Sequence, residues 1–201
     1  MNLFPQSNEF IKLPLKDANV LYLEQFYNSE TSNFLFNTLR KEIQWQQDNI
    51  KLFGKTYKQP RLTALYAENE KPYSYSNITM YPESFFKELE QIKSDIEEKI
   101  AHKFTTCLAN LYRTGNDSNG WHSDNEKELG HNPVIASLSL GATRSFQLKH
   151  KTDSSQRFNI ELPSGSLLIM KGTTQEFWKH QIPKTKKHVG ERINLTFRTI
   201  L

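Results

Sequence analysis

The chain has 201 residues, one cysteine, and 26 lysine and arginine residues against 22 aspartate and glutamate residues, a formal net charge of +4. A single cysteine cannot form an intramolecular disulfide, and no apolar run approaches the roughly 20 residues of a membrane span, which argues against disulfide-stapled and helical membrane proteins. The length fits one domain with a proper core, and residues 1–17 lack the features of a signal peptide. We therefore expect a soluble, monomeric protein without membrane association, in the cytoplasm and, in a eukaryote, also the nucleus.

The first half of the chain predicts one extended segment and two helices. Residues 19–27 suggest a strand, and residues 30–46 carry apolar side chains at roughly helical spacing. A second helix is predicted over residues 82–101, with Pro82 in its first turn. Its apolar stripe is formed by Phe85, Leu89, Ile92, Ile96 and Ile100. Both stripes are interpreted as faces turned toward a core.

From about residue 104 the pattern changes to short β-rich runs separated by Gly, Pro, Asn, Asp and Ser. These runs cover residues 105–113, 133–141, 143–150, 157–162, 165–172, 176–182 and 192–201. Successive strands without intervening helices predict a mainly β (α+β) fold, a sandwich or barrel with the N-terminal helices packed on one face. Cys107 falls within the first run and is interpreted as a buried core thiol.

We expect a single domain over residues 1–201, because no internal repeat or linker is visible. Residues 1–103 would supply helices and residues 104–201 the β-rich core. The segment 50–77 fits neither pattern, since basic and aromatic residues interleave in it. Such interleaving is typical of surfaces that bind nucleic acid, as well as of ordinary charged loops.

Two histidines and one aspartate are candidates for a metal site. His122 and Asp124 are two residues apart, so an extended strand would point both side chains to the same side. His180, in a distant β-rich run, is suitably placed to be the third ligand. Two imidazoles and one carboxylate leave three positions open on an octahedral ferrous ion. A strand histidine that bonds a backbone carbonyl is the alternative for His180, and His102, His131, His150 and His188 are interpreted as surface residues.

A strand near the C-terminus, RINLTFR, supports this site. Arg192, Asn194 and Arg198 occur at even spacing, so all three would share one face of the strand. Buried guanidinium groups require anionic partners. A dicarboxylate cosubstrate would supply them. Pairing with Asp or Glu side chains, or exposure of Arg198 at the strand end, remain alternatives.

These features occur within an ordered set of motifs that resembles the AlkB family of iron(II)- and 2-oxoglutarate-dependent dioxygenases. The set runs from residue 60 to the C-terminus: PRLTALYAE, PYSYSNITM, NLYR, WHSDNE, PVIASLSLGATRSFQL, GSLLIMKG, WKHQIPK and RINLTFRTI. The resemblance implies a double-stranded β-helix, or jelly roll. It also implies that His122, Asp124 and His180 bind iron, that Asn194 and Arg198 hold the C1 carboxylate of 2-oxoglutarate, and that Asn110, Tyr112 and Arg192 hold its C5 carboxylate.

The resemblance further implies a pocket for a methylated base. Tyr75 would stack on the base, and Glu126 would contact its exocyclic amine. Asn125 departs from the aspartate that repair homologues often carry, which bears on base preference. Within the segment 50–77, a nucleotide-recognition lid, Phe53 would wedge into a duplex while Lys55 and Arg61 contact phosphates. A charged surface loop with Phe53 packed into the core is the alternative.

The activity implied is oxidative demethylation of 1-methyladenine and 3-methylcytosine in DNA or RNA, with iron(II), 2-oxoglutarate and dioxygen, yielding formaldehyde, succinate and carbon dioxide. Such a methyl group resists hydrolysis and must be attacked oxidatively, and both bases are cations that suit Glu126 and an aromatic face. One alternative is the same iron chemistry on a protein or small molecule. Another is a module that binds alkylated nucleic acid without catalysis.

Overall fold

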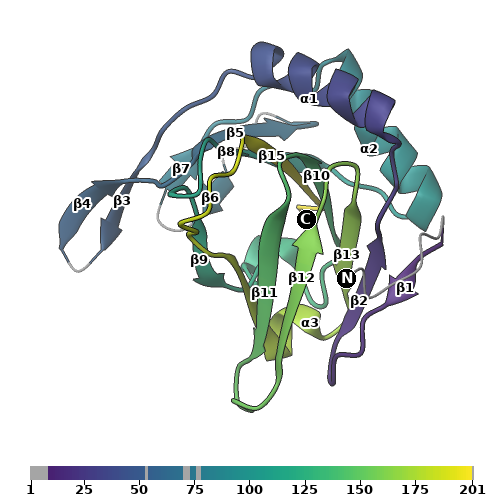
Figure 1. The fold of residues 1–201 in the computed structure, drawn as a ribbon, viewed down its shortest axis with the longest axis vertical. Coiled ribbons are helices and arrows are strands. Elements are labelled where there is room, and N and C mark those ends of the chain that lie inside the picture. The colour runs from purple at the N-terminus through teal and green to yellow at the C-terminus, as the bar shows by residue number, and fades with distance from the viewer. Residues whose placement is uncertain (1–8, 53, 70–72, 76–77, 201) are drawn as a thin grey trace.

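Two antiparallel β-sheets face each other in the computed structural model, which describes residues 9–52, 54–69, 73–75 and 78–200 (Figure 1). The larger sheet has seven strands in the order β1 (Ile11–Lys12), β2 (Asn19–Leu23), β13 (Leu167–Lys171), β10 (Ile135–Gly141), β15 (Arg192–Arg198), β8 (Thr106–Tyr112) and β5 (Leu62–Ala67). The smaller sheet has four, in the order β12 (Arg157–Leu162), β11 (Arg144–His150), β14 (Trp178–Ile182) and β9 (Asn119–His122). This arrangement agrees with the predicted jelly roll.

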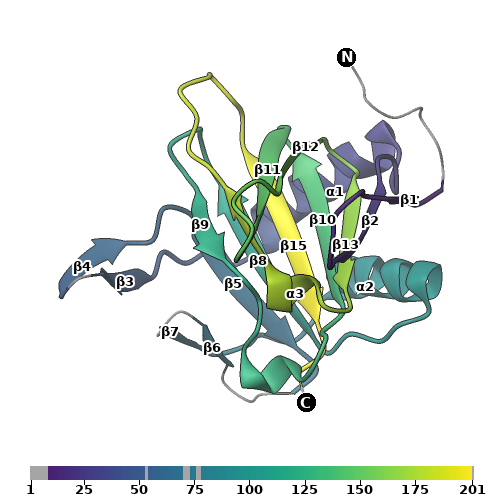
Figure 2. The same ribbon diagram turned by 90° about the horizontal axis from the view of Figure 1, so that it is seen from below.

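Helices α1 (Ser29–Glu42) and α2 (Lys87–Ile100) cover the outer face of the larger sheet (Figures 1 and 2). Leu39 of α1 and Ile92 of α2 are fully buried in one apolar cluster with sheet residues such as Leu138 and Leu195. Their burial anchors the helices to the sheet, because apolar area removed from water stabilises by about 25 cal/mol per Å². Two shorter helical segments, the 3-10 helix η1 (Lys127–Leu129) and α3 (Thr174–Phe177), lie in connections.

Both main helices are shorter than the sequence predicts. Asn28 caps α1 by accepting a hydrogen bond from the Thr31 N–H at 2.8 Å, but the helix ends at Glu42 and not at residue 46. The expectation that Pro82 lies in the first turn of the second helix is wrong, since α2 begins at Lys87. Next to Pro82, Glu83 exchanges backbone hydrogen bonds with Leu65 and Ala67 of β5. These hydrogen bonds hold the chain around Glu83 extended along β5, so the helix begins after this segment.

The strand predicted within residues 19–27 is present as β2, but the first half of the chain also contributes strands that were not predicted. Strands β1, β2 and β5 all come from the first 103 residues, and β5 pairs with β8 along its whole length. Strand β2 pairs with β13. The first half therefore completes the larger sheet on both sides, because a sheet edge is stabilised by whichever extended segment can satisfy its backbone groups.

Strand β15 lies in the middle of the larger sheet and has two different faces. Ile193, Leu195 and Phe197 belong to the apolar cluster beneath the helices. Arg192, Asn194 and Arg198 lie on the opposite face, where they line a cavity between the sheets. The predicted alternation of this strand is confirmed.

His150 was expected at the surface and is instead buried, with a relative exposure of 7%. It ends β11, where the even-numbered residues face inward. Its ring stacks on Phe177 at a centroid distance of 5.8 Å, and its Nδ1 accepts the Asp153 N–H at 3.1 Å. The flanking lysines suggested that His150 is exposed, but the alternation of β11 turns its side chain inward. His131 and His188 are exposed as expected, whereas His102 is partly buried.

Two hairpins occupy the segment predicted to form the lid. The first consists of β3 (Asn49–Leu52) and β4 (Lys55–Lys58), and it projects away from both sheets (Figures 1 and 2). The second consists of β6 (Tyr73–Tyr75) and β7 (Ile78–Met80). All four side chains of β4 are exposed, so both faces of this strand meet solvent. Over the described ranges, no helix has the length and apolar character needed to cross a bilayer.

Candidate functional site

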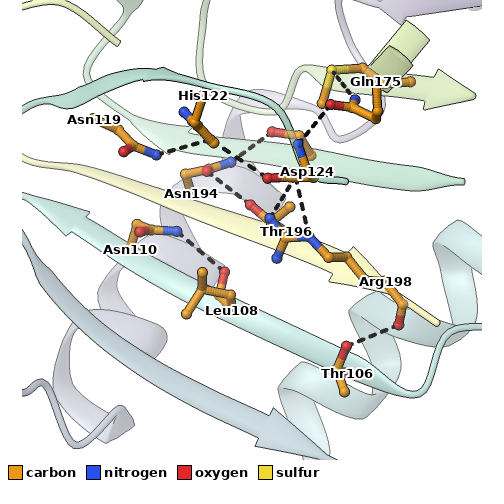
Figure 3. A network of polar contacts seen from close by, with 12 residues as sticks. Thr106, Leu108, Asn110, Asn119, His122, Asp124, Gln175, Asn194, Thr196 and Arg198 are labelled. Carbon is orange, nitrogen blue, oxygen red and sulfur yellow. Dashed lines mark hydrogen bonds and ion pairs between the residues drawn. The ribbon is translucent and has the colours of Figure 1, made fainter. Parts of the chain in front are cut away.

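His122, Asp124 and His180 come together between the sheets (Figure 3 labels the first two). His122 ends β9 and pairs in register with His180 on β14, so their rings lie 4.2 Å apart between centroids. Each of the three residues offers one ligand atom, and these atoms lie within 4.8 Å of one another. Asp124 was expected on the same strand as His122, but β9 ends at His122. The carboxylate nevertheless reaches the two imidazoles.

The two imidazoles are held in the form that binds metals. His122 Nδ1 lies 2.7 Å from the Gly120 carbonyl oxygen and donates to it as N–H, which leaves the lone pair on Nε2. Nε2 lies 3.6 Å from Asp124 Oδ1. Burial lowers the pKa of His122 and, with the His122 ring beside it, lowers the pKa of His180 to about 3. Both rings are therefore neutral at pH 7, as metal ligands must be.

Asp124 divides its carboxylate between two environments. Arg198 donates to Oδ2 from Nη2 at 2.7 Å and from Nε at 3.2 Å (Figure 3). Burial alone would raise the pKa of Asp124, but Arg198 and the nearby histidines hold it well below its usual range. Oδ1 is buried and has no hydrogen-bond partner among the described groups. An anionic oxygen left in this way beside two imidazoles fits a metal cation.

Arg198 thus realises one of the alternatives left open by the sequence, because a carboxylate pairs with it. Arg192 does not. It is 1% exposed, and its Nη2 donates to Ser139 Oγ at 2.9 Å. Its Nε and Nη1 are buried with no hydrogen-bond partner among the residues that the structure describes. Desolvation lowers the pKa of this guanidinium to about 10, which still leaves it charged at pH 7. A buried cation with two unused donors fits the carboxylate of a ligand.

Both arginines line one cavity between the two sheets. Strand register explains why the other predicted cosubstrate residues lie there too. Tyr112 of β8 is opposite Arg192, and Asn110 is opposite Asn194. The Arg192 guanidinium carbon is 5.3 Å from the Tyr112 ring centroid. The structure therefore brings together Asn110, Tyr112, Arg192, Asn194, Arg198 and the three candidate metal ligands.

Arg61 does not lie where the lid hypothesis placed it. Its side chain is 4% exposed, and Nε donates to Asn110 Oδ1 at 2.7 Å. The chain has already left the hairpin at this point, and β5 begins at the next residue beside β8. Arg61 therefore does not lie on an exposed lid. It fixes the amide of a cavity residue instead.

The candidate base-contact residues differ in what the structure shows of them. Glu126 is partly buried, and its Oε2 has no hydrogen-bond partner within the described part of the chain. Burial and the negative charge of Asp124 raise its pKa. Asn125 and Lys55 are exposed. Phe53 and the side chain of Tyr75 lie outside the described residues, so their predicted roles stay predictions.

Sequence reasoning missed residues that hold the cavity side chains in place. Ser137 and Ser139 of β10 accept hydrogen bonds from Asn194 Nδ2 at 2.8 Å and from Arg192, respectively. Their spacing of two within a strand was a usable signal. Gln175 of α3 accepts the Asp124 backbone N–H on its Oε1 at 2.9 Å (Figure 3). No local pattern indicates that contact, because the two residues are 51 positions apart.

Gln175→Leu is expected to weaken metal binding about tenfold, since loss of a group that orients a metal ligand costs roughly 10–100-fold in affinity. Titration with Mn²⁺ followed by calorimetry measures the change. Ser123→Ala is the matched control, because Ser123 lies in the same loop and its Oγ donates to the Trp178 carbonyl of β14 and not to Asp124. Equal metal affinity of the Gln175→Leu variant and the wild type would show that Gln175 does not position Asp124.

Comparisons with known proteins agree with this geometry. A family model described as the 2OG-Fe(II) oxygenase superfamily matches residues 19–198. The chain is 43% identical to "Alpha-ketoglutarate-dependent dioxygenase alkB homolog 3" of Bos taurus, over 93% of this chain and 68% of the relative. It is 35% identical to "DNA oxidative demethylase ALKBH2" of Arabidopsis thaliana, over 92% of this chain and 67% of the relative.

A solved structure, "The structure of OsALKBH1", superposes with a TM-score of 0.68 at 18% identity, covering 95% of this chain and all of that one. At this identity the likeness shows the fold alone, and it confirms the double-stranded β-helix. Sequence identity, domain match and the two-histidine, one-carboxylate cluster agree with one another. The chain belongs to the AlkB family of the 2OG-Fe(II) oxygenase superfamily and is an iron(II)- and 2-oxoglutarate-dependent dioxygenase.

Proposed function

We propose that the protein removes methyl groups from ring nitrogens of alkylated bases in DNA or RNA, with 1-methyladenine and 3-methylcytosine as substrates. The observation that carries the proposal is the shared cavity. The metal-binding cluster lines it together with Arg192, a buried cation with two donors that have no hydrogen-bond partner among the described residues, and Glu126 lies two positions after Asp124 in the sequence. The names of relatives at 34–43% identity, alkB homolog 3 and DNA oxidative demethylase ALKBH2, support a nucleic-acid substrate.

In this proposal His122, Asp124 and His180 hold the iron(II). When bound, the metal supplies the oxidising chemistry that uses dioxygen and converts 2-oxoglutarate to succinate and carbon dioxide. The Arg198 pair keeps Asp124 ionised and directs Oδ1 toward the two imidazoles. The protein thus contributes a fixed, anionic and largely dehydrated ligand set.

The remaining cavity residues would orient 2-oxoglutarate. Arg192, with Tyr112 and Asn110 on the neighbouring strand, would receive the C5 carboxylate, because its two unused donors require an anion. Arg198 and Asn194 would receive the C1 carboxylate. Asn194 is held by Ser137 and by Thr196, whose Oγ1 donates to Asn194 Oδ1 at 3.2 Å. A network that is already formed limits the entropy lost on binding.

Glu126 would recognise the positive charge of the methylated base. Its carboxylate is partly buried beside Asp124, and burial raises its pKa, so a cationic ligand stabilises its ionised form. Such a base must leave its stack or already be single-stranded to reach the cavity. The exposed hairpin residues Lys55, Tyr57 and Lys58 suit contact with the flanking backbone. We further propose that the protein acts as a monomer in the cytoplasm and, in a eukaryote, also in the nucleus.

Succinate formation in the presence of methylated oligonucleotide tests this function. We expect 3-methylcytosine in single-stranded DNA, duplex DNA or RNA to stimulate 2-oxoglutarate consumption, while the same unmethylated oligonucleotides and a peptide mixture do not. Comparing the three nucleic acids also identifies the preferred form. Consumption stimulated only by peptides or small molecules would assign the enzyme to another substrate class.

A further inference from the structure

The outer face of the smaller sheet carries a row of positive charge that the cavity chemistry does not use. Lys149 of β11 is opposite Arg157 of β12 on one side and opposite Lys179 of β14 on the other. Residues opposite each other in neighbouring strands project from the same face. Arg157 and Lys179 are exposed and Lys149 is half-buried, whereas the adjacent residues Leu148 and His180 face inward. The three cations, here called the basic row, therefore lie side by side on the outside of the sheet (Figure 1 labels β11 and β12).

Placing like charges directly opposite one another destabilises a sheet. No ion pair is formed by Lys149, Arg157 or Lys179 in the part of the chain that the structure describes. Glu161 lies at the far end of β12, opposite Ser145, and Glu176 attracts Lys151. The smaller sheet thus carries three neighbouring cations that form no ion pair among the described residues. Such a group of cations suits an anionic ligand.

A hollow adjoins the basic row. Among the described residues its lining contains no acidic side chain and consists of His150 and the cationic and hydroxyl residues Lys149, Lys151, Thr152, Ser154, Arg157 and Lys179. Burial and the charge of Lys179 lower the pKa of Lys151, whose Nζ also donates to the Gln175 carbonyl at 2.8 Å. Such a hollow, with several cations and hydroxyl donors, matches the charge and size of phosphate groups.

The row is linked to the strand that carries His122. Lys149 Nζ lies 4.4 Å from the centroid of the Trp121 ring, and Trp121 directly precedes His122 on β9. Strands are spaced about 4.8 Å apart, so the row spans about 10 Å and leads from β12 toward β9. The nucleotides that flank a base bound in the cavity could therefore pass around the β9 edge of the smaller sheet and reach its outer face.

We propose that the basic row is a second binding surface for the sugar-phosphate backbone of the nucleic-acid substrate, separate from the lid hairpin. The proposal rests on the proposed function, since it assigns a path to the same substrate. It explains why three cations are kept in register on a face that holds no part of the iron site. The ligand is a polynucleotide, because a row across three strands requires successive phosphates.

Binding of a fluorescent, unmethylated single strand of about 15 nucleotides, followed by anisotropy over a range of NaCl concentrations, tests the row. The variant replaces Lys149, Arg157 and Lys179 by glutamine. Each lost phosphate contact reduces the slope of log K against log salt by about 0.7, so we expect a reduction of about 2. Affinity at about 50 mM NaCl should fall on the order of 100-fold.

The matched control replaces Lys41, Lys87 and Lys99 by glutamine, which changes the net charge equally on the exposed surface of α1 and α2. Its slope should equal that of the wild type. An unchanged slope in the row variant, or equal losses in both variants, would overturn the proposal. If the row variant is unfolded by circular dichroism, Lys179→Gln alone carries the test, with an expected slope reduction of about 0.7.

A small anion could occupy the hollow instead. Tight binding of inorganic phosphate at constant ionic strength, together with unchanged oligonucleotide binding in the row variant, would assign the hollow to free phosphate and overturn the proposal. Because the oligonucleotide carries no methylated base, the result does not depend on turnover. The demethylation assay therefore tests the proposed function, and the salt dependence of oligonucleotide binding separately tests the basic row.

Discussion

Asp124→Asn is expected to abolish turnover and to weaken Mn²⁺ binding by on the order of 100-fold or more, because loss of an anionic ligand exceeds the effect of losing its outer partners. Unfolding free energy should also fall, by about 3 kcal/mol, since Arg198 loses the carboxylate to which it donates twice. Metal binding by calorimetry, formaldehyde release and urea denaturation measure the three effects.

Asp117→Asn is the matched control for this experiment. Asp117 is also a buried aspartate in an ion pair, with Arg113 Nε at 2.8 Å, but it does not line the cavity. It should lower stability and leave Mn²⁺ affinity at the wild-type value. If Asp124→Asn lost stability but bound Mn²⁺ as tightly as wild type, Asp124 would not be a metal ligand.

Arg192→Met is expected to weaken 2-oxoglutarate binding by about 3 kcal/mol, or roughly 100-fold, because the cosubstrate loses its buried cationic partner. The same change should leave the melting temperature of the ligand-free protein unchanged or higher. Two Arg192 nitrogens are buried with no hydrogen-bond partner among the described residues, so the desolvation cost of the charge is offset only in part by Ser139 and the Tyr112 ring, and an apolar side chain of similar length removes that cost.

Arg144→Met provides the contrast. Arg144 is equally buried, but it donates to the backbone carbonyls of Thr114, Asp117 and Pro183. Its loss should lower the melting temperature because three carbonyl oxygens lose their donor. Calorimetric titration with 2-oxoglutarate and thermal scans of both variants make the comparison. A large destabilisation by Arg192→Met with unchanged 2-oxoglutarate affinity would assign Arg192 to the fold and not to the cosubstrate.

The parts of the site that could be predicted are those in which one strand carries the information. The spacing of Arg192, Asn194 and Arg198 places them on one face wherever the strand lies, because alternation is a local property. The strand over residues 157–162 was predicted at its observed bounds for the same reason. The grouping of His180 with His122 and Asp124 was a candidate from residue type and position, and the resemblance supported it, because local spacing cannot show that β9 and β14 meet in the folded sheet.

Predictions failed where a distant partner overrides a local signal. Pro82 is a good first residue for a helix, but the adjacent Glu83 is bound to β5. Arg61 follows a basic hairpin in sequence, yet its guanidinium is bound to Asn110 of β8. Lysines on both sides suggested that His150 is exposed, although β11 turns it inward. For Pro82 and Arg61 the deciding contact lies on a strand that the sequence does not identify as a neighbour, whereas for His150 the alternation of its own strand outweighs the polarity of the flanking lysines.

Formation of formaldehyde and succinate in equal amounts from a 3-methylcytosine oligonucleotide tests the central claim most directly. With iron(II), dioxygen and 2-oxoglutarate supplied, the wild-type protein should release both products and restore unmodified cytosine, and Asp124→Asn should release neither. Succinate without formaldehyde, or no product from any methylated DNA or RNA, would contradict the account.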